Sequence, residues 1–323
     1  MSTIPADIAD LLTREDNFLV AAHFNPDGDA IGATAALGFI LSALGKQFQL
    51  YNATGIPPQF VWMALPGPLV TELPPADSIS WIITLDSGDA DRLGADLKAL
   101  LPKKQSINID HHLGNPEYGT LNWVDTTASS TGEMISRLAD ALGLALRGSL
   151  AEAIYTAMVT DTGGFRFSNT RPETMELAAR MIRAGLNPGL VNAKIDNQWT
   201  MARIKLWSEV MSNVAMYSDG RIGVIRLPVD IFDRTGATRA DCDGLINNVM
   251  RIRGVRVAMS LREDTDYIKF SLRSVGDVNV RDVAASFGGG GHKNAAGGQI
   301  VSDLETAQAQ LLEAVEPIAT DGV

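Results

Sequence analysis

Short apolar runs alternate with longer amphipathic stretches over the first 190 residues of this 323-residue chain. The apolar runs predict strands at 18–23, 47–52, 80–86, 105–110 and 121–125. The stretches between and after them predict helices at 30–45, 90–102, 129–144, 149–161 and 172–184. Strands that alternate with helices are typical of the α/β class, so we expect a doubly wound, mainly parallel sheet.

The second half of the chain has a different rhythm. Strands are predicted at 221–228, 255–263 and 267–274, and helices at 241–252, 279–287 and from Leu304 onward. This pattern favours a smaller α+β domain. We expect a first domain over 1–190, a helical linker over 191–210 and a second domain over 211–323.

Acidic and imidazole side chains follow three of the predicted strands. His23, Asp27 and Asp29 come after the first strand, Asp86 ends the 80–86 strand, and Asp110-His111-His112 end the 105–110 strand. Parallel strands bring their carboxyl ends to one edge of the sheet, where ligands bind. A further carboxylate, Asp161, ends an apolar helix. We therefore expect one composite site.

Clustered carboxylates repel one another unless a cation lies between them. Aspartate and histidine without a thiolate suit Mn²⁺ or Mg²⁺, with Co²⁺ as an alternative. The candidate ligands are too many for one ion and would suit two ions about 3.5–4 Å apart, which activate a water and clamp a phosphate. These ligands are His23, Asp27, Asp29, Asp86, His111 and Asp161.

A second candidate region is the run GGGGHKNAAGG at 288–298. Consecutive glycines let backbone N–H groups close on a phosphate or a nucleotide, although the same run also suits a flexible turn. Arg273, Arg166 and Asn169 are further candidates for substrate contacts, or else ordinary surface residues. The candidates within the run are Gly288, Gly289, Gly290, Gly291, His292 and Asn294.

Charge and cysteine content narrow the choice of function. The net charge of −11 and the lack of a basic run disfavour long duplex nucleic acid, so any nucleic-acid substrate should be short. The single cysteine, Cys242, excludes an intramolecular disulfide and a multi-cysteine zinc site, and it fits a reducing cytoplasm. We expect neither a signal peptide nor a membrane span.

With these residues in view, the chain resembles the DHH phosphoesterase family. Asp110-His111-His112 match the name-giving triplet, and His23 to Asp29, Asp86 in LDSGD and Asp161 in TDTGGFRFSNT match other family motifs. The glycine run resembles the signature of the DHH-associated C-terminal domain. The resemblance implies a Rossmann-like catalytic domain and a smaller second domain, with the active site in the cleft between them.

The resemblance also implies roles for the residues. One Mn²⁺ would be held by His23, Asp27 and Asp86, and the other by Asp29, Asp86, His111 and Asp161. His112 would lie by the scissile phosphate, with Asp110 orienting the histidines, and both are therefore candidate catalytic residues.

The length and the FRFSNT segment resemble the branch that contains bacterial oligoribonucleases (nanoRNases) and 3'-phosphoadenosine 5'-phosphate (pAp) phosphatases. We expect hydrolysis of short RNA, of linear dinucleotides such as pApA, or of pAp. A pyrophosphatase or polyphosphatase and a non-hydrolytic nucleotide sensor are the alternatives. Whether the chain forms a homodimer stays open.

Overall fold

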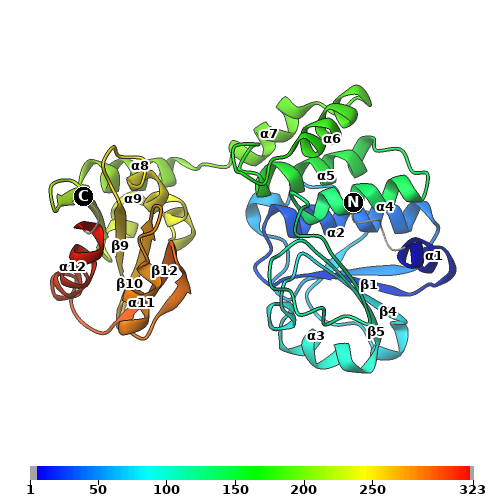
Figure 1. Cartoon of the computed structure of the whole chain (residues 1–323), viewed down its shortest axis with the longest axis horizontal. Helices are drawn as coiled ribbons and strands as arrows, with labels where there is room; N and C mark the ends of the chain where they lie inside the picture. The colour runs from blue at the N-terminus through cyan, green and yellow to red at the C-terminus, as the bar shows by residue number, and fades with distance from the viewer. Residues whose placement is uncertain (1–5, 321–323) are drawn as a thin grey trace. The chain divides into compact units, whose positions relative to one another are not determined.

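The computed structural model describes residues 6–320 and divides the chain into two compact units (Figure 1). Unit 1 extends to Gln198 and unit 2 begins at Trp199. The expected linker, 191–210, spans the end of one helix and most of the next, and its role as a linker stays a prediction. The outermost residues of the two expected domains, 1–5 and 321–323, lie outside the described range.

Unit 1 is built on a parallel sheet with the strand order β3-β2-β1-β4-β5-β6, which confirms the doubly wound α/β prediction. The chain proceeds outward from β1 in one direction, then returns to place β4 on the other side of β1. Ligands of such sheets bind at this reversal. The strands are β1 (Phe18–Ala22), β2 (Phe48–Tyr51), β3 (Leu69–Val70), β4 (Trp81–Leu85), β5 (Gln105–Asp110) and β6 (Leu121–Val124).

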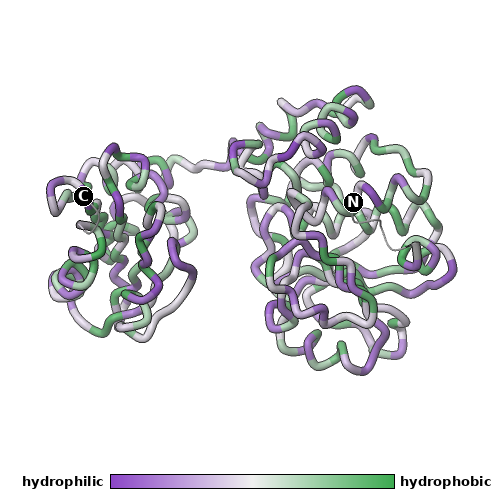
Figure 2. The backbone as a smooth tube through the Cα atoms, in the orientation of Figure 1, coloured by the Kyte–Doolittle hydropathy of each residue, from purple (hydrophilic) through white to green (hydrophobic). Residues whose placement is uncertain are grey.

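Helices cover both faces of this sheet, because both faces of its central strands are apolar. In β1, Val20 belongs to the core cluster shared with α2, α4 and α5, whereas Leu19 packs in the opposite cluster with α3 (Figure 1). Hydrophobic and hydrophilic residues interchange along most helices (Figure 2). The helices are α1 (Ala6–Arg14), α2 (Gly28–Ala43), α3 (Ala95–Leu100), α4 (Thr131–Ala141), α5 (Gly148–Asp161), α6 (Pro172–Arg183) and α7 (Pro188–Asp196).

Helix α2 is buried almost all round, as expected for a helix enclosed between a sheet and other helices. It approaches α5 so closely that a Cβ at Gly32 would lie 2.6 Å from the carbonyl oxygen of Ala153. Asp27 caps its first turn by accepting hydrogen bonds from the amides of Asp29 and Ala30. The loop that carries the first acidic residues is thereby fixed to the start of a rigid helix.

The single helix predicted over 90–102 is wrong. The chain forms a 3₁₀ turn at Ala90–Leu93, the short α3, and another 3₁₀ turn at Leu101–Lys103. Gly94 adopts a positive φ of 88°, which ends one helical segment before the next begins. The apolar periodicity is that of a single helix, but the backbone conformation of Gly94 interrupts it.

Unit 2 contains a mixed sheet in the order β11-β12-β10-β9-β8-β7, in which β8 and β9 are parallel and the other pairs antiparallel. The glycine run forms two of its strands, β11 and β12, which the sequence did not predict. The strands are β7 (Ala215–Tyr217), β8 (Ile222–Leu227), β9 (Val257–Glu263), β10 (Ile268–Ser274), β11 (Gly290–His292) and β12 (Ala295–Ile300).

Two sets of helices cover the two faces of this sheet. One apolar cluster joins the sheet to α11 and α12, and another joins it to α8, α9 and α10. No helix among residues 6–320 has the length and apolar character needed to cross a bilayer. The helices are α8 (Met201–Ser212), α9 (Ile231–Thr235), α10 (Leu245–Val249), α11 (Val280–Ser286) and α12 (Leu304–Thr320).

Candidate metal centre

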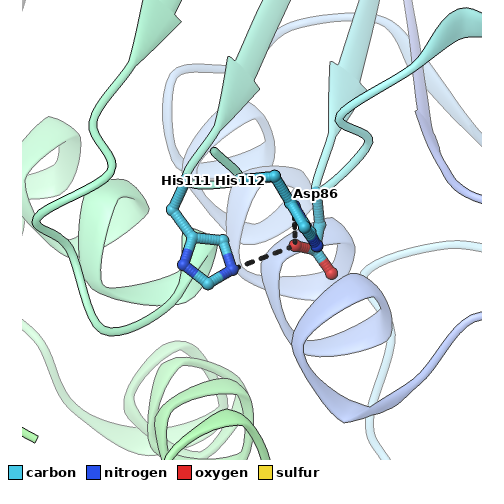
Figure 3. A group of neighbouring side chains, drawn as sticks. All are labelled: Asp86, His111 and His112. Atoms are coloured by element: carbon cyan, nitrogen blue, oxygen red, sulfur yellow. Dashed lines mark ion pairs between the residues drawn. The ribbon is translucent and has the colours of Figure 1, made fainter. Parts of the chain in front are cut away.

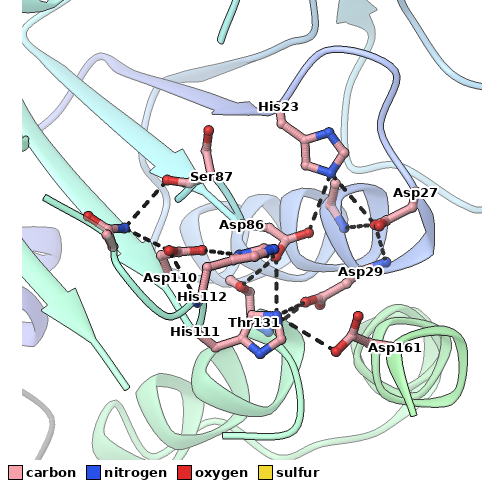
Figure 4. Close-up of polar contacts among 12 residues, drawn as sticks. His23, Asp27, Asp29, Asp86, Ser87, Asp110, His111, His112, Thr131 and Asp161 are labelled. Carbon is pink, nitrogen blue, oxygen red and sulfur yellow. Dashed lines mark hydrogen bonds and ion pairs between the residues drawn. The ribbon is translucent and has the colours of Figure 1, made fainter. Parts of the chain in front are cut away.

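Asp86 lies at the centre of a cluster of carboxylates and imidazoles at the carboxyl edge of the unit 1 sheet (Figure 4). It follows β4 directly, beside β1, where the strand order reverses. Its backbone is in the left-handed region with φ of 54°, a conformation that costs free energy in a non-glycine residue. The side chain is buried, and its two oxygens face two different groups of side chains.

The first group is formed by His23, Asp27 and Asp86. The Nε2 atom of His23 lies 3.7 Å from Oδ2 of Asp86 and 3.8 Å from Oδ1 of Asp27. The other ring nitrogen, Nδ1, lies 2.9 Å from the carbonyl oxygen of Phe24, to which it donates. Nε2 is therefore unprotonated in the neutral ring and able to bind a cation.

The second group is centred on His111, whose ion pair with Asp86 is drawn in Figure 3. Its Nε2 atom lies 3.5 Å from Oδ1 of Asp86, 3.6 Å from Oδ2 of Asp29 and 3.7 Å from Oδ2 of Asp161. Its Nδ1 atom faces the carbonyl oxygen of Ala128 at 3.3 Å. Three carboxylates from three separate segments thus converge on one imidazole nitrogen.

His112 is oriented by Asp110. Its Nδ1 atom lies 2.8 Å from Oδ1 of Asp110, and the other carboxylate oxygen accepts a hydrogen bond of 2.6 Å from Asn115. Asp110 is fully buried, whereas the His112 side chain is 40% exposed. Asp110 therefore orients the imidazole through Nδ1, and Nε2 points away from this hydrogen bond.

The protonation behaviour reflects this crowding. Burial disfavours the charged ring of His23 and of His111, but the neighbouring carboxylates outweigh burial and raise the pKa to about 9 and about 10. Burial and the charge of Asp86 raise the pKa of Asp161 to about 6 and that of Asp29 well above its usual range. The hydrogen bond to Asp110 raises the pKa of His112.

Asp86 shows the opposite behaviour. Burial alone would raise the pKa of its carboxyl, but the contacts with His111 and His23 hold the pKa below its usual range. Without a cation, the cluster thus retains extra protons on its other members to balance negative charge.

The donor set and its spacing fit two divalent cations. Ligands at about 2.1–2.3 Å from one ion lie roughly 3–4.5 Å apart, and the distances around His23 and His111 are in this range. Among the described residues, three triads have ligand atoms within 4.8 Å of one another, and Asp86 belongs to two of them. The triads are His23/Asp27/Asp86, Asp29/His111/Asp161 and Asp86/His111/His112.

Sequence reasoning missed the polar side chains that support the cluster. Thr131 donates its backbone amide to Asp29 at 2.7 Å and its hydroxyl to Asp86 at 3.2 Å. Asn115 holds Asp110. The pattern Ser130-x-x-Glu133 marks the start of a helix and could have indicated that backbone N–H groups are available there.

The expected substrate residues of unit 1 have protein partners. Asn169 donates its amide to the carbonyl oxygen of Ser129 at 3.0 Å and to Oδ2 of Asp161 at 3.2 Å. Arg166 is exposed and donates to the carbonyl oxygen of Gly163. Asn169 therefore holds Asp161, and contact of either residue with substrate stays a prediction.

In unit 2 an open pocket of about 630 Å³ lies along β10 and β12. Arg273, Gly288 and Gly290 line it, as do Lys269 and Ser271, which the sequence analysis missed. Residues 269, 271 and 273 alternate with apolar ones along β10, so their period of two could have identified this face.

The other residues of the glycine run have structural partners. A Cβ at Gly289 would lie 2.3 Å from the carbonyl oxygen of Gly297, and Gly291 has φ of 139°. Asn294 donates to Ser274 and to the carbonyl oxygens of residues 276 and 278. His292 is exposed on β11. Their role in substrate binding stays a prediction.

Each unit matches the model of a known protein family. Residues 17–158 match the model of the DHH family, N-terminal domain, and residues 221–320 match the DHHA1 domain. The bifunctional oligoribonuclease and PAP phosphatase NrnA of Thermus thermophilus is 33% identical over 93% of this chain and 90% of its own length. The protein of that name from Bacillus subtilis is 29% identical, over 90% of this chain and 94% of its own length.

A solved structure resembles the whole chain. The exopolyphosphatase-related protein from Bacteroides fragilis is 28% identical and has a TM-score of 0.85, covering 97% of this chain and 96% of that one. The similarity extends over both units.

Proposed function

The chain belongs to the DHH family and carries a DHHA1 domain, and from this premise we propose that it is a Mn²⁺-dependent phosphoesterase acting on short substrates. The substrates would be RNA of a few nucleotides or linear dinucleotides such as pApA, cleaved to mononucleotides, and pAp, converted to AMP. The activities in the names of its relatives from Thermus thermophilus and Bacillus subtilis support this choice.

One observation carries the proposal: carboxylates from β4, α2 and α5 converge on Nε2 of His111, within 3.7 Å. Two cations bound here would lower the pKa of a water and withdraw charge from the phosphate oxygens. We assign His23, Asp27 and Asp86 to one ion, and Asp29, His111 and Asp161, with Asp86 shared, to the other. The two oxygens of Asp86 face the two groups, which supports a bridging role.

The protein itself would orient the phosphate. His112 is fixed through Nδ1 by Asp110, and this hydrogen bond raises its pKa, which favours the charged ring with a second N–H on Nε2. We assign this N–H as the donor to a phosphate oxygen. In unit 2, Arg273 and the backbone of Gly288 and Gly290, which line the pocket, would bind the terminal nucleotide.

A product time course with Mn²⁺ over pAp, pApA and a five-nucleotide RNA tests the proposal. We expect AMP from the first two and mononucleotides from the RNA. Inorganic pyrophosphate serves as the comparison substrate, because a pyrophosphatase would use the same ligands. Rapid phosphate release from pyrophosphate with no cleavage of the other three would contradict the proposal.

A further inference from the structure

One short segment, residues 128–132, contacts most of the second ligand group. The amides of Thr131 and Gly132 donate to the two carboxylate oxygens of Asp29 at 2.7 and 2.9 Å. The carbonyl oxygen of Ala128 faces Nδ1 of His111 at 3.3 Å. Because α4 begins here, the positive end of its dipole also faces the Asp29 carboxylate.

The same segment is linked to the two remaining ligands of that group, to Asp86 directly and to Asp161 through Asn169. The hydroxyl of Thr131 donates to Asp86 at 3.2 Å. The carbonyl oxygen of Ser129 accepts from Asn169, whose amide also bonds to Asp161. Among the hydrogen bonds of the described residues, the segment makes one to the first group, the one to the shared Asp86.

Glu133 anchors this segment through hydrogen bonds to Ser129. Its carboxylate is buried, and Oε2 accepts hydrogen bonds from the amide and the hydroxyl of Ser129 at 3.2 and 2.6 Å. Thr174, from α6, donates to the same oxygen at 2.9 Å. Charge-assisted hydrogen bonds of this kind are about twice as strong as neutral ones.

Two arginines neutralise the buried charge. Arg137 and Arg171 both donate to Oε1 of Glu133, the latter at 3.2 Å. Arg137 also donates to Asp125 at 2.6 Å. Asp125 accepts hydrogen bonds from the backbone amide and the hydroxyl of Thr127 and so fixes the turn there. One ionic network therefore holds the segment at Ser129 and the chain just before it at Thr127. Among the described residues, none of the side-chain contacts of this network is with a proposed metal ligand.

We propose that Glu133 is a positioning residue that fixes the 128–132 segment and thereby the geometry of Asp29, His111 and Asp161. This inference rests on the proposed function for its metal part. The proposal predicts that the two cation sites respond differently to loss of the Glu133 charge. The affinity of the site formed by Asp29, His111 and Asp161 should fall, whereas the affinity of the site formed by His23 and Asp27 should not change. Substitution of a polar residue that supports a metal ligand typically lowers the affinity for the metal by about 10–100-fold.

The test compares Glu133→Gln with the wild type by two measurements. The first is hydrogen exchange of the Thr131 and Gly132 amides in chelator, which needs no metal. We expect exchange to accelerate at least about tenfold in the variant, while amides of β4 keep their protection. The second is Mn²⁺ titration by calorimetry, in which we expect one of two sites to weaken by about 10–100-fold.

Two further variants keep the test decisive. Arg171→Gln removes one guanidinium from a partly exposed position and should give a smaller change in the same direction, even if Glu133→Gln folds poorly. Asp140→Asn is the matched control, because Asp140 lies on the same helix and its ion pair within residues 6–320 is with Arg180 at the surface. It should change neither measurement.

Unchanged amide exchange and unchanged Mn²⁺ affinities in Glu133→Gln would overturn the proposal. Equal weakening of both ions would also overturn it, because the effect would then be general. A wild-type protein that takes up no Mn²⁺ would instead contradict the proposed function, and the exchange measurement would still decide whether Glu133 fixes the segment.

Discussion

The two units handle polar groups in opposite ways. In unit 1 the candidate residues are mostly buried and already bonded to one another: Asp29, Asp86 and Asp110 are each 2% exposed or less. In unit 2 three of the candidates, Arg273, Gly288 and Gly290, line an open pocket, and much of its wall is backbone, because glycines occupy β11 and β12. A preorganised charged centre suits chemistry, and an open backbone surface suits recognition of a nucleotide.

The difference teaches where each kinetic property should reside. Changes in the buried centre should lower kcat, since the same groups would act in every turnover. Changes in the pocket of unit 2 should raise KM, since they would remove the proposed contacts with the substrate but leave the reacting groups intact.

The largest effect is expected from Asp86→Asn in unit 1. Removing the charge shared by the two ligand groups should lower kcat by at least about 10³-fold, because both proposed cation sites would lose a ligand at once. AMP release from pApA with Mn²⁺ measures this. Asp91→Asn, an exposed carboxylate paired with Lys98, is the control and should retain wild-type turnover.

A smaller effect is expected from Gly290→Ala in unit 2. An added Cβ meets no atom within 4 Å and projects from the pocket wall, so the fold should keep its stability. If a phosphate approaches this backbone, KM should rise roughly tenfold, the size of a lost charge-assisted hydrogen bond, with kcat little changed. Gly67→Ala, which also meets open space, is the matched control. A fall in kcat without a rise in KM would contradict the assignment of substrate binding to unit 2 and of catalysis to unit 1.

The smallest effect concerns the stability of the protein in chelator. The pKa values of His23 and His111 are raised from 6.5 to about 9 and about 10, so the folded state binds protons that the unfolded state has released. The stability that they contribute is full below pH 6.5 and is lost as the pH rises through 9 to 10. The melting temperature should therefore fall by several degrees between pH 7 and pH 9.

Excess Mn²⁺ should offset this fall, since cations bind the deprotonated ligands. His111→Gln should reduce the pH dependence in chelator by about half. Scanning calorimetry at both pH values measures each effect, and a melting temperature that rises with pH in chelator would contradict the assignment of these protons to unit 1.

The site could be predicted from sequence where a strand end and a functional side chain coincide. Asp86 and His111 follow apolar runs, and the strand alternation alone brings such positions to one edge of a parallel sheet. The network around Glu133 could not be predicted, because its contacts join Glu133 to Thr174 across 41 residues and depend on where helix α4 begins.

The fold of unit 2 was harder to predict for a related reason. The glycine run carries no alternation of apolar and polar side chains, so nothing in its pattern indicates that β12 pairs with β10. In unit 1, the break at Gly94 depended on a positive φ that apolar periodicity does not report.

The order of the strands has a consequence for how the protein is made. Although β1 and its ligand loop are synthesised first, their neighbour β4 lies about 60 residues further on, and the last carboxylate, Asp161, ends α5. The ribosome would therefore have to release the chain as far as Asp161 before the centre could close, and until then α2 would lack the helix α5 that covers it. Cations could not template the early steps, and chaperones would meet an apolar helix rather than an acidic pocket.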